Sequence, residues 1–248
     1  MKESIKDWIV NNILVIRIRF CRGFGKEEPS GSLSFYDGFN SLNNWRIGQP
    51  WGRFHPDYPY QFYSDDAVST NEKLILKQFP SGDKLSFPQY IGLISSKQSF
   101  GYGYFRMRIK LPKGVGLWPA VWLSAEDSWP PEIDLIEGYS DRKGDWGSRL
   151  QSNFHWNLEK CKESSGARNH PVDTESDITV GCLFKKDCIK IYYNGWLVRQ
   201  ITSEHTMKWY RNKKMLVILN NAIRPDFVNM VSNQKSEFIV YDFSFFDV

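Results

Sequence analysis

The chain has few of the residues that build metal centres or disulfide frameworks. Its 248 residues include four histidines and four cysteines, the latter being Cys21, Cys161, Cys182 and Cys188. No CxxC pair occurs, and the histidines are not spaced as zinc ligands, so a structural zinc is not expected. A disulfide between Cys182 and Cys188 on a hairpin, or between Cys161 and either of them, remains open at this stage.

Phosphate-binding loops and clusters of one charge are also missing. Neither GxGxxG nor GxxxxGK[ST] occurs, which weighs against nucleotide chemistry. The 32 basic and 28 acidic residues leave a net charge of +4, and the basic residues are scattered along the chain. A nucleic-acid partner is therefore not expected.

Aromatic residues are abundant, at 16 % of the chain with ten Trp. They fill a broad β core or stack on sugar rings, and composition alone leaves both interpretations open. From Leu33 onward short apolar or alternating runs recur between turn residues such as Tyr193-Asn194-Gly195. This spacing predicts an all-β fold, an antiparallel sandwich or jelly roll. The expected strands include 73–79, 90–95, 103–111, 120–124, 133–137, 189–193, 215–219 and 238–246.

We expect the first 31 residues to form a segment separate from one large domain at 32–248. An apolar stripe at helical spacing comprises Ile5, Trp8, Ile9, Ile13, Ile16 and Phe20. Nearby basic residues are Lys2, Lys6, Arg17, Arg19 and Arg22. The stripe is too short to span a membrane, and no small-residue cleavage site follows it. We expect an amphipathic helix that docks on a protein partner or a membrane surface. A divergent signal sequence and a helix packed on its own domain are the alternatives.

Glu132, Asp134 and Glu137 form the most informative pattern. The segment alternates acidic and aliphatic residues, and then breaks that alternation by one residue. In a regular strand Glu137 would face away from the other two acids, but a β-bulge at Leu135 or Ile136 would return it to their face. Crowded carboxylates shift one another's pKa values, which suits an acid and a nucleophile acting on one bond. The competing interpretation is a solvated acidic strand face.

Segments upstream of these acids carry a family resemblance. They are Gly101-Tyr102-Gly103-Tyr104-Phe105-Arg106-Met107-Arg108-Ile109-Lys110-Leu111-Pro112 and Leu117-Trp118-Pro119-Ala120-Val121-Trp122-Leu123. Followed by the acidic segment, they resemble glycoside hydrolase family 16, in particular its laminarinase-like branch. Weaker similarity extends from Leu33 to Val248. The resemblance implies a β-jelly-roll sandwich of two antiparallel sheets with a concave cleft, and a retaining endo-acting hydrolase of a β-linked polysaccharide.

The resemblance also assigns residue roles. It makes Glu132 the nucleophile, Glu137 the acid/base, and Asp134 the carboxylate that tunes the pair. The predicted substrate-binding residues are Trp51, Trp118, Trp122, His155 and Trp156. For His155 a structural histidine is the alternative. No cofactor is required, but family members hold a structural calcium, for which Asp37 and Asp242 are the candidate ligands.

The substrate is less defined than the reaction. Pro131 replaces the Gly usual before the nucleophile, Leu93 replaces an Arg, and Asn220-Asn221-Ala222-Ile223-Arg224 lacks the usual glycines. A β-1,3-glucan is the simplest expectation. A galactan, a host glycan, or a carbohydrate-binding or attachment module in a larger, virion-type assembly are the alternatives. An extracellular or surface-associated location is expected.

Overall fold

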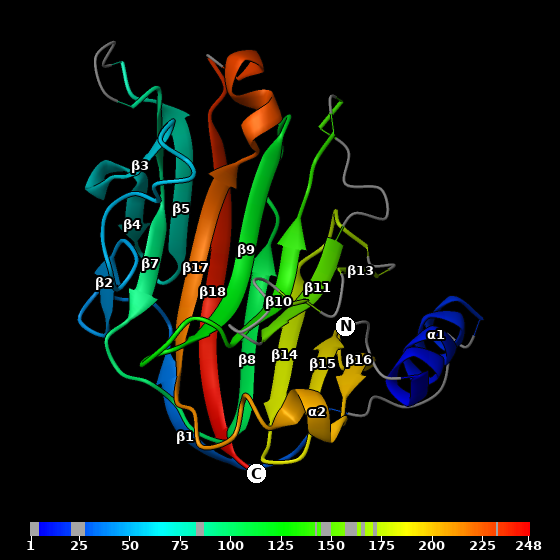
Figure 1. The fold of residues 1–248 in the computed structure, drawn as a ribbon. Helices are drawn as coiled ribbons and strands as arrows, with labels where there is room; N and C mark the ends of the chain where they lie inside the picture. The colour runs from blue at the N-terminus through cyan, green and yellow to red at the C-terminus, as the bar shows by residue number, and fades with distance from the viewer. Residues whose placement is uncertain are drawn as a thin grey trace.

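The computed structural model describes residues 5–20, 28–82, 87–141, 143–144, 150–156, 163–164, 167–170, 173–231 and 233–248. For 15–20 and 163–164 it describes the backbone. Two sheets packed face to face make up most of it (Figure 1). Their strands pair antiparallel except for β3 and β6, which are parallel. The predicted all-β sandwich with one N-terminal helix is confirmed.

The strands of the ten-stranded sheet run in the order β16-β15-β14-β8-β18-β5-β6-β3, with β1 on β18 and β4 on β5. Their bounds are β1 Ser32–Asp37, β3 Gln61–Tyr63, β4 Val68–Thr70, β5 Leu74–Pro80, β6 Gln89–Ile91, β8 Gly103–Lys110, β14 Ile178–Phe184, β15 Ile189–Tyr193, β16 Trp196–Ile201 and β18 Ser236–Asp247.

The eight-stranded sheet runs in the order β12-β11-β10-β9-β17-β7-β2, with β13 on β11. Its bounds are β2 Trp45–Ile47, β7 Leu93–Ser96, β9 Leu117–Ala125, β10 Glu132–Gly138, β11 Leu150–Trp156, β12 Glu163–Ser164, β13 Arg168–Asn169 and β17 Met215–Ile223. The helices are α1 Ile5–Phe20 and α2 Glu204–Met207, with 3-10 turns at η1 Asp65–Ala67 and η2 Pro225–Met230.

The main core lies between the sheets and follows the two-residue period of the strands. On β9, Leu117, Val121 and Leu123 enter this core, whereas Ala120 and Trp122 belong to a smaller cluster on the other face of the sheet. Apolar residues on both faces are typical of a strand that is covered on both sides. The eight-stranded sheet therefore has an outer face that can carry a site.

The expected strand at 90–95 is two strands in different sheets. The break falls at Gly92, where a Cβ atom would lie 2.5 Å from the backbone oxygen of Ala67. Only glycine fits so close an approach, and there the chain passes from β6 to β7. The predicted turn at Asn194-Gly195 is confirmed: both residues have positive φ, at 52° and 81°, as a two-residue hairpin requires.

Helix α1 packs against β16, at the edge of the ten-stranded sheet (Figure 1). Asn11 accepts a hydrogen bond from the backbone N–H of Gln200 (2.7 Å) and donates one to its carbonyl (2.9 Å). Asp7 accepts hydrogen bonds from the backbone N–H groups of Thr202 (3.1 Å) and Ser203 (3.2 Å). The helix therefore docks on its own domain through polar side chains.

Of the cysteines, Cys182 is buried and Cys188 is half-buried, and both are free. The disulfide between them, which the sequence left open, is therefore not formed. Cys21 and Cys161 lie outside the described residues.

Candidate active site

A bulge in β10 brings the acids to one face. Pairing with β9 shifts register between Asp134 and Ile136, and pairing with β11 shifts between Asp134 and Glu137. Leu135 and Ile136 are consequently both buried in the core between the sheets. Glu137 then lies on the outer face of the sheet with Glu132 and Asp134. The predicted bulge is present, and it gives the strand a face with three carboxylates.

Glu137 receives hydrogen bonds from two aromatic side chains. The indole N–H of Trp118 donates to its Oε1 (3.1 Å), and the hydroxyl of Tyr139 donates to the same oxygen (2.8 Å). The two rings stack with centroids 5.6 Å apart. These bonds fix the carboxyl group and leave Oε2 without either donor.

Glu132 and Asp134 share His155. The Nε2 of His155 lies 3.0 Å from Asp134 Oδ2 and 3.5 Å from Glu132 Oε1. The other oxygen of Glu132 accepts the indole N–H of Trp129 at 2.9 Å. One carboxylate oxygen of each acid and Nε2 of His155 lie within 4.8 Å of one another. The hydrogen bond between His155 and Asp134 explains this cluster without a bound metal ion. His155 thus lies beside the predicted nucleophile, on the strand that pairs with β10.

Burial and mutual repulsion favour protonated carboxyl groups here. Burial, followed by the Asp134 charge, raises the pKa of Glu132 to about 8, although His155 acts in the opposite direction. Burial and then the Glu137 charge also raise the pKa of Asp134 well above its usual value, against the effect of Arg199. Both groups therefore favour the protonated form near neutral pH, so the predicted nucleophile Glu132 has to give up a proton before it can attack.

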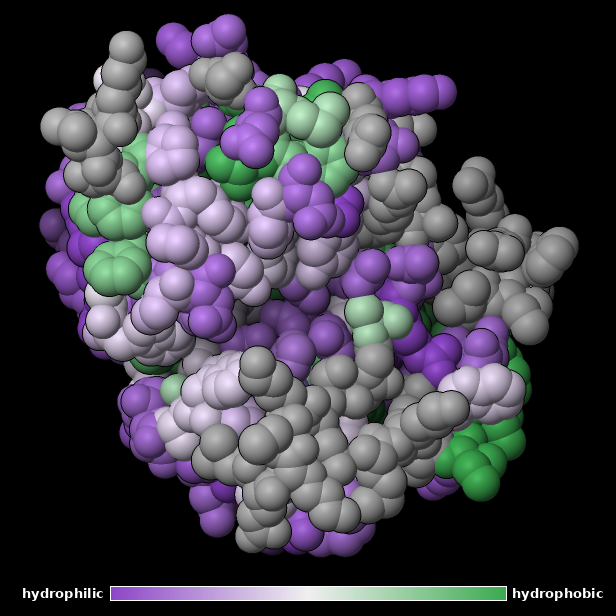
Figure 2. Space-filling view, turned by 45° about the horizontal axis from the view of Figure 1, so that its top comes forward, coloured by the Kyte–Doolittle hydropathy of each residue, from purple (hydrophilic) through white to green (hydrophobic). Residues whose placement is uncertain are grey.

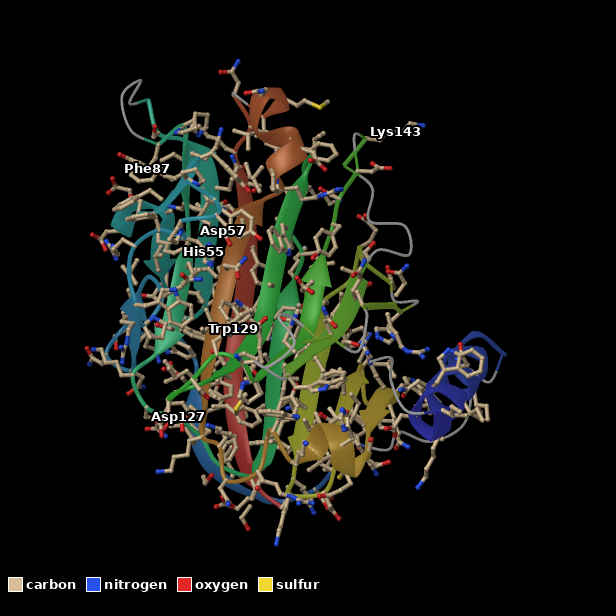
Figure 3. The ribbon with its side chains drawn as sticks, viewed as in Figure 1. His55, Asp57, Phe87, Asp127, Trp129 and Lys143 are labelled. Carbon is tan, nitrogen blue, oxygen red and sulfur yellow. The ribbon has the colours of Figure 1, made fainter. Side chains whose placement is uncertain are left out.

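Aromatic side chains form walls around the acids. Tyr58 makes an edge contact with Trp118 (centroids 5.5 Å apart), and the Trp122 indole N–H donates to Asn220 Oδ1 (2.9 Å). The surface is hollowed near its centre, with a hydrophilic floor (Figure 2). Figure 3 labels His55 and Asp57 on the loop that carries Tyr58, and Trp129 on the loop before β10. The flat aromatic rings around the acids suit stacking on the apolar surfaces of sugar rings.

The structure places only some of the predicted substrate-binding residues beside the acids. Trp118 and His155 contact the acids, and Trp122 is almost entirely buried beneath this face. Trp156 does not line the groove: it is 1 % exposed and lies in the main core, because it follows His155 on β11 and points to the opposite side. That assignment was wrong. Trp51 is 52 % exposed on the loop after β2, and its role stays a prediction.

The candidate calcium ligands have protein partners. Asp37 accepts hydrogen bonds from the N–H groups of Phe39, Asn44 and Trp45, which use both its oxygens. Asp242 lies 3.6 Å from Arg108 in an ion pair. The carboxylate oxygens that a calcium ion would need already accept N–H hydrogen bonds or pair with an arginine. These two carboxylates therefore do not fit a calcium site. No step below uses a metal.

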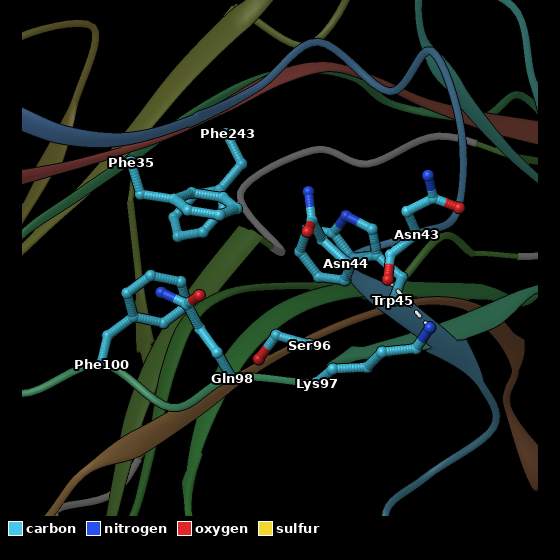
Figure 4. A pocket seen from close by; sticks show the side chains of 9 residues that line it. All are labelled: Phe35, Asn43, Asn44, Trp45, Ser96, Lys97, Gln98, Phe100 and Phe243. Carbon is cyan, nitrogen blue, oxygen red and sulfur yellow. Dashed lines mark hydrogen bonds between the residues drawn. The ribbon is translucent and has the colours of Figure 1, made fainter.

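A small cavity of about 80 Å³ lies elsewhere, beside β1 and β2 (Figure 4). Its walls include the rings of Phe35, Phe100 and Phe243, and Lys97 closes one side by donating to the Asn43 carbonyl (2.8 Å). None of the three acids lines it. The chemistry therefore belongs to the open groove.

Four groove residues escaped the sequence analysis. Tyr139 lies two residues after Glu137. Asn153 lies two residues before His155, and its side-chain nitrogen is 3.2 Å from His155 Nε2, so strand parity could have found both. Trp129 lies three residues before Glu132, separated from it by two prolines. Tyr58 comes from an irregular loop, where no periodic signal exists.

Comparison with known proteins agrees with this architecture. The model of glycosyl hydrolases family 16 matches residues 60–224. The chain therefore belongs to family 16 of the glycosyl hydrolases, as the resemblance predicted. It is 31 % identical over 189 residues to a protein of Niallia circulans named glucan endo-1,3-beta-glucosidase A1, covering 68 % of this chain and 26 % of the relative. It is 28 % identical over 135 residues to the Rhizobium meliloti (strain 1021) endo-1,3-1,4-beta-glycanase ExsH, covering 53 % of this chain and 27 % of the relative.

The fold is shared with solved structures of this family. One, described as a non-specific endo-beta-1,3(4)-glucanase, superposes with a TM-score of 0.73 at 20 % identity, covering 90 % of this chain and 99 % of the other. The predicted jelly-roll architecture is thereby confirmed. The chain spans about a quarter of the length of the two curated relatives named above.

Proposed function

We propose that this protein is a retaining, endo-acting glycoside hydrolase that cleaves a β-linked polysaccharide, most simply a β-1,3-glucan. The observation that carries the proposal is the bulged strand β10, on which Glu132, Asp134 and Glu137 share one face. Family membership supports the reaction, and the names of the two relatives support a β-glucan substrate. The open groove suits a long chain that enters without a free end (Figure 2).

In the first step Glu132 attacks the anomeric carbon and forms a glycosyl ester. Glu137 gives its proton to the leaving oxygen as the glycosidic C–O bond breaks. In the second step Glu137 takes a proton from water, the water oxygen attacks the anomeric carbon, and Glu132 leaves as a carboxylate. The configuration of the sugar is retained because two inversions occur.

Asp134 and His155 position and tune the nucleophile in this scheme. Because His155 lies between them, a proton on the imidazole favours the ionised form of Glu132. Repulsion from Asp134 has the opposite effect. With burial, these opposing effects leave the pKa of Glu132 raised, so Glu132 has to lose its proton before it attacks.

The two glutamates can be tested separately. Glu132→Ala should nearly abolish cleavage, and added azide should restore it with an α-configured glycosyl azide. Glu137→Ala should slow cleavage of the polysaccharide by ~10²–10⁴-fold, while activated aryl glycosides still react and azide yields the β-configured product. Product anomers are identified by NMR.

The matched control is Glu126→Ala, which removes an exposed carboxylate just after β9 and should leave turnover unchanged. Exchanged anomers in the two glutamate variants would reverse the assignment of nucleophile and acid/base. Full activity in both would end the catalytic interpretation of β10.

Substrate identity is tested by new reducing ends on a panel of polysaccharides. A β-1,3-glucan should be cleaved fastest. Preference for a galactan or a host glycan would redirect the substrate proposal within the same reaction. Binding of a polysaccharide without any new reducing ends would favour an attachment module instead.

We also propose that residues 1–31 act in location or assembly, and that 32–248 form the catalytic domain. In this proposal α1 docks the enzyme on a protein partner or a membrane surface. Its apolar side chains Ile5, Trp8, Ile9 and Ile13 support this role, since they are 46–80 % exposed.

A further inference from the structure

Helix α1 has its polar face inward. Asp7 and Asn11 are 1 % and 0 % exposed, because both are bonded to the backbone of residues 200–203. Leu14 is the buried apolar residue on the same side. A helix that only completed a hydrophobic core would show the opposite arrangement, with its apolar stripe inward.

The first four residues of the apolar stripe consequently face solvent, while the side chains of Ile16 and Phe20 lie outside those that the structure describes. Ile5, Trp8, Ile9 and Ile13 are between 46 % and 80 % exposed. Hydrophobic colour gathers at the lower right of Figure 2, on the side where α1 lies in Figure 1. Several large apolar residues on one exposed helix face mark an interaction surface.

Positive charge accompanies the stripe. Lys6 is exposed next to it, and Lys2, Arg17, Arg19 and Arg22 lie in the same stretch of sequence. The acidic residues of this stretch are Glu3 and Asp7, and Asp7 is buried against β16. The excess of positive charge in this stretch would repel a second copy of the same stretch and would be attracted by an anionic surface.

We infer that α1 lies in the plane of an anionic lipid surface, with the stripe in the boundary between headgroups and acyl chains. Among the described residues no helix is long and apolar enough to cross a bilayer, so the contact is interfacial. Trp8, half exposed on the stripe, is a residue type that favours this boundary. The inference rests on the docking role proposed for α1 and is independent of the hydrolase activity.

The site and this surface are on different sheets. Helix α1 lies against β16 of the ten-stranded sheet, whereas the acids are on the eight-stranded sheet. No groove residue described above takes part in the lipid contact. Bound enzyme therefore keeps its groove for a polysaccharide close to the membrane.

Vesicle sedimentation tests the inference with the full chain. The protein should sediment with phosphatidylcholine vesicles that contain about 30 % phosphatidylserine, and much less with phosphatidylcholine alone or in high salt. Ile13→Glu should weaken the binding roughly tenfold or more, since it places a charge in the apolar boundary. Leu33→Glu is the matched control, because Leu33 and Ile13 are both 57 % exposed, and it should bind as the wild type does.

Polysaccharide cleavage and thermal unfolding are measured on the same variants, so that loss of fold or of catalysis is seen separately. Unchanged sedimentation of Ile13→Glu would overturn the inference, as would failure of the folded wild type to bind. A dimer in light scattering that Ile13→Glu dissociates, without vesicle binding, would assign the stripe to a second copy instead.

Discussion

At the scale of single residues, the two donors on Glu137 determine which oxygen is available for catalysis. Trp118 and Tyr139 both donate to Oε1. A proton on a carboxyl group that already accepts two hydrogen bonds at Oε1 is better placed on Oε2. The catalytic proton is thereby directed toward one side of the groove.

Tyr139→Phe removes one of these donors with almost no change in shape. A hydrogen bond to a charged group contributes about 1.5–3 kcal/mol, so cleavage of the polysaccharide should slow by about ten- to a hundredfold. Activated aryl glycosides need little proton donation and should suffer less. Steady-state kinetics on both substrates measure the difference.

Tyr241→Phe is the matched control. Its hydroxyl also donates to a carboxylate, Asp177 (3.2 Å), but it lies on β18 of the other sheet. This variant should react like the wild type. Equal losses on both substrates in Tyr139→Phe would mean that the tyrosine supports the fold rather than proton donation.

The sequence could identify site residues only where the alternation of side chains along a strand or the order of a motif marks them. Motif order brought Glu132, Glu137, Trp118 and His155 into consideration, and the structure places them together. Trp156 is in the core instead, because neighbouring side chains on β11 point to opposite faces of the sheet. Tyr58 reaches the groove from a loop, and its position depends on long-range packing that no local pattern records.

At the scale of elements, the bulge in β10 could be predicted and the orientation of α1 could not. Three acids that break a two-residue period need one extra residue to share a face, so local spacing determined the bulge. The helical period also predicted α1 correctly. The period shows that the helix has a polar and an apolar face. The polar face turns inward because Asn11 and Asp7 hydrogen-bond to the backbone of Gln200 and Thr202, and these contacts are visible only in the folded structure.

A chain that begins at Ser32 tests the role of this element. It should remain folded and cleave polysaccharide at the wild-type rate, because among the described residues α1 packs on β16 of the ten-stranded sheet, whereas the acids lie on the eight-stranded sheet. Loss of the hydrogen bonds from Asp7 and Asn11 should lower the unfolding free energy by about 1–3 kcal/mol. Circular dichroism and chemical unfolding measure this at low protein concentration.

In the full chain, Asn11→Ala provides the comparison for this truncation. It should lose part of the same stability, because the backbone groups of Gln200 lose a partner. Collapse of the fold on truncation would show that α1 belongs to the catalytic domain.

For the whole molecule, the raised pKa of Glu132 links stability to pH. Its value in the folded state is about 8, against 4.5 for the ordinary group, so the folded state binds more protons in that range. The unfolding free energy should therefore fall as pH rises from about 4.5 through 8. Glu132→Gln cannot ionise, so its stability relative to the wild type should increase over the same range, by up to roughly 1.4 kcal/mol per unit of pKa difference.

Chemical unfolding at acidic, neutral and alkaline pH measures this difference. Glu237→Gln, at an exposed position on β18, is the control and should show no such trend. A pH-independent difference between Glu132→Gln and the wild type would contradict the raised pKa.

The polar contacts of α1 also have a consequence for solubility. The edge of a sheet exposes N–H and C=O groups that can template a strand from another molecule. Asn11 occupies both such groups of Gln200, and Asp7 accepts the N–H of Thr202, one residue beyond the end of β16. Without the helix, concentrated protein should associate through this strand, so we expect α1 to prevent intermolecular β-pairing. A protein that binds a surface through the apolar side of α1 would still have its polar side on β16 and would keep this protection.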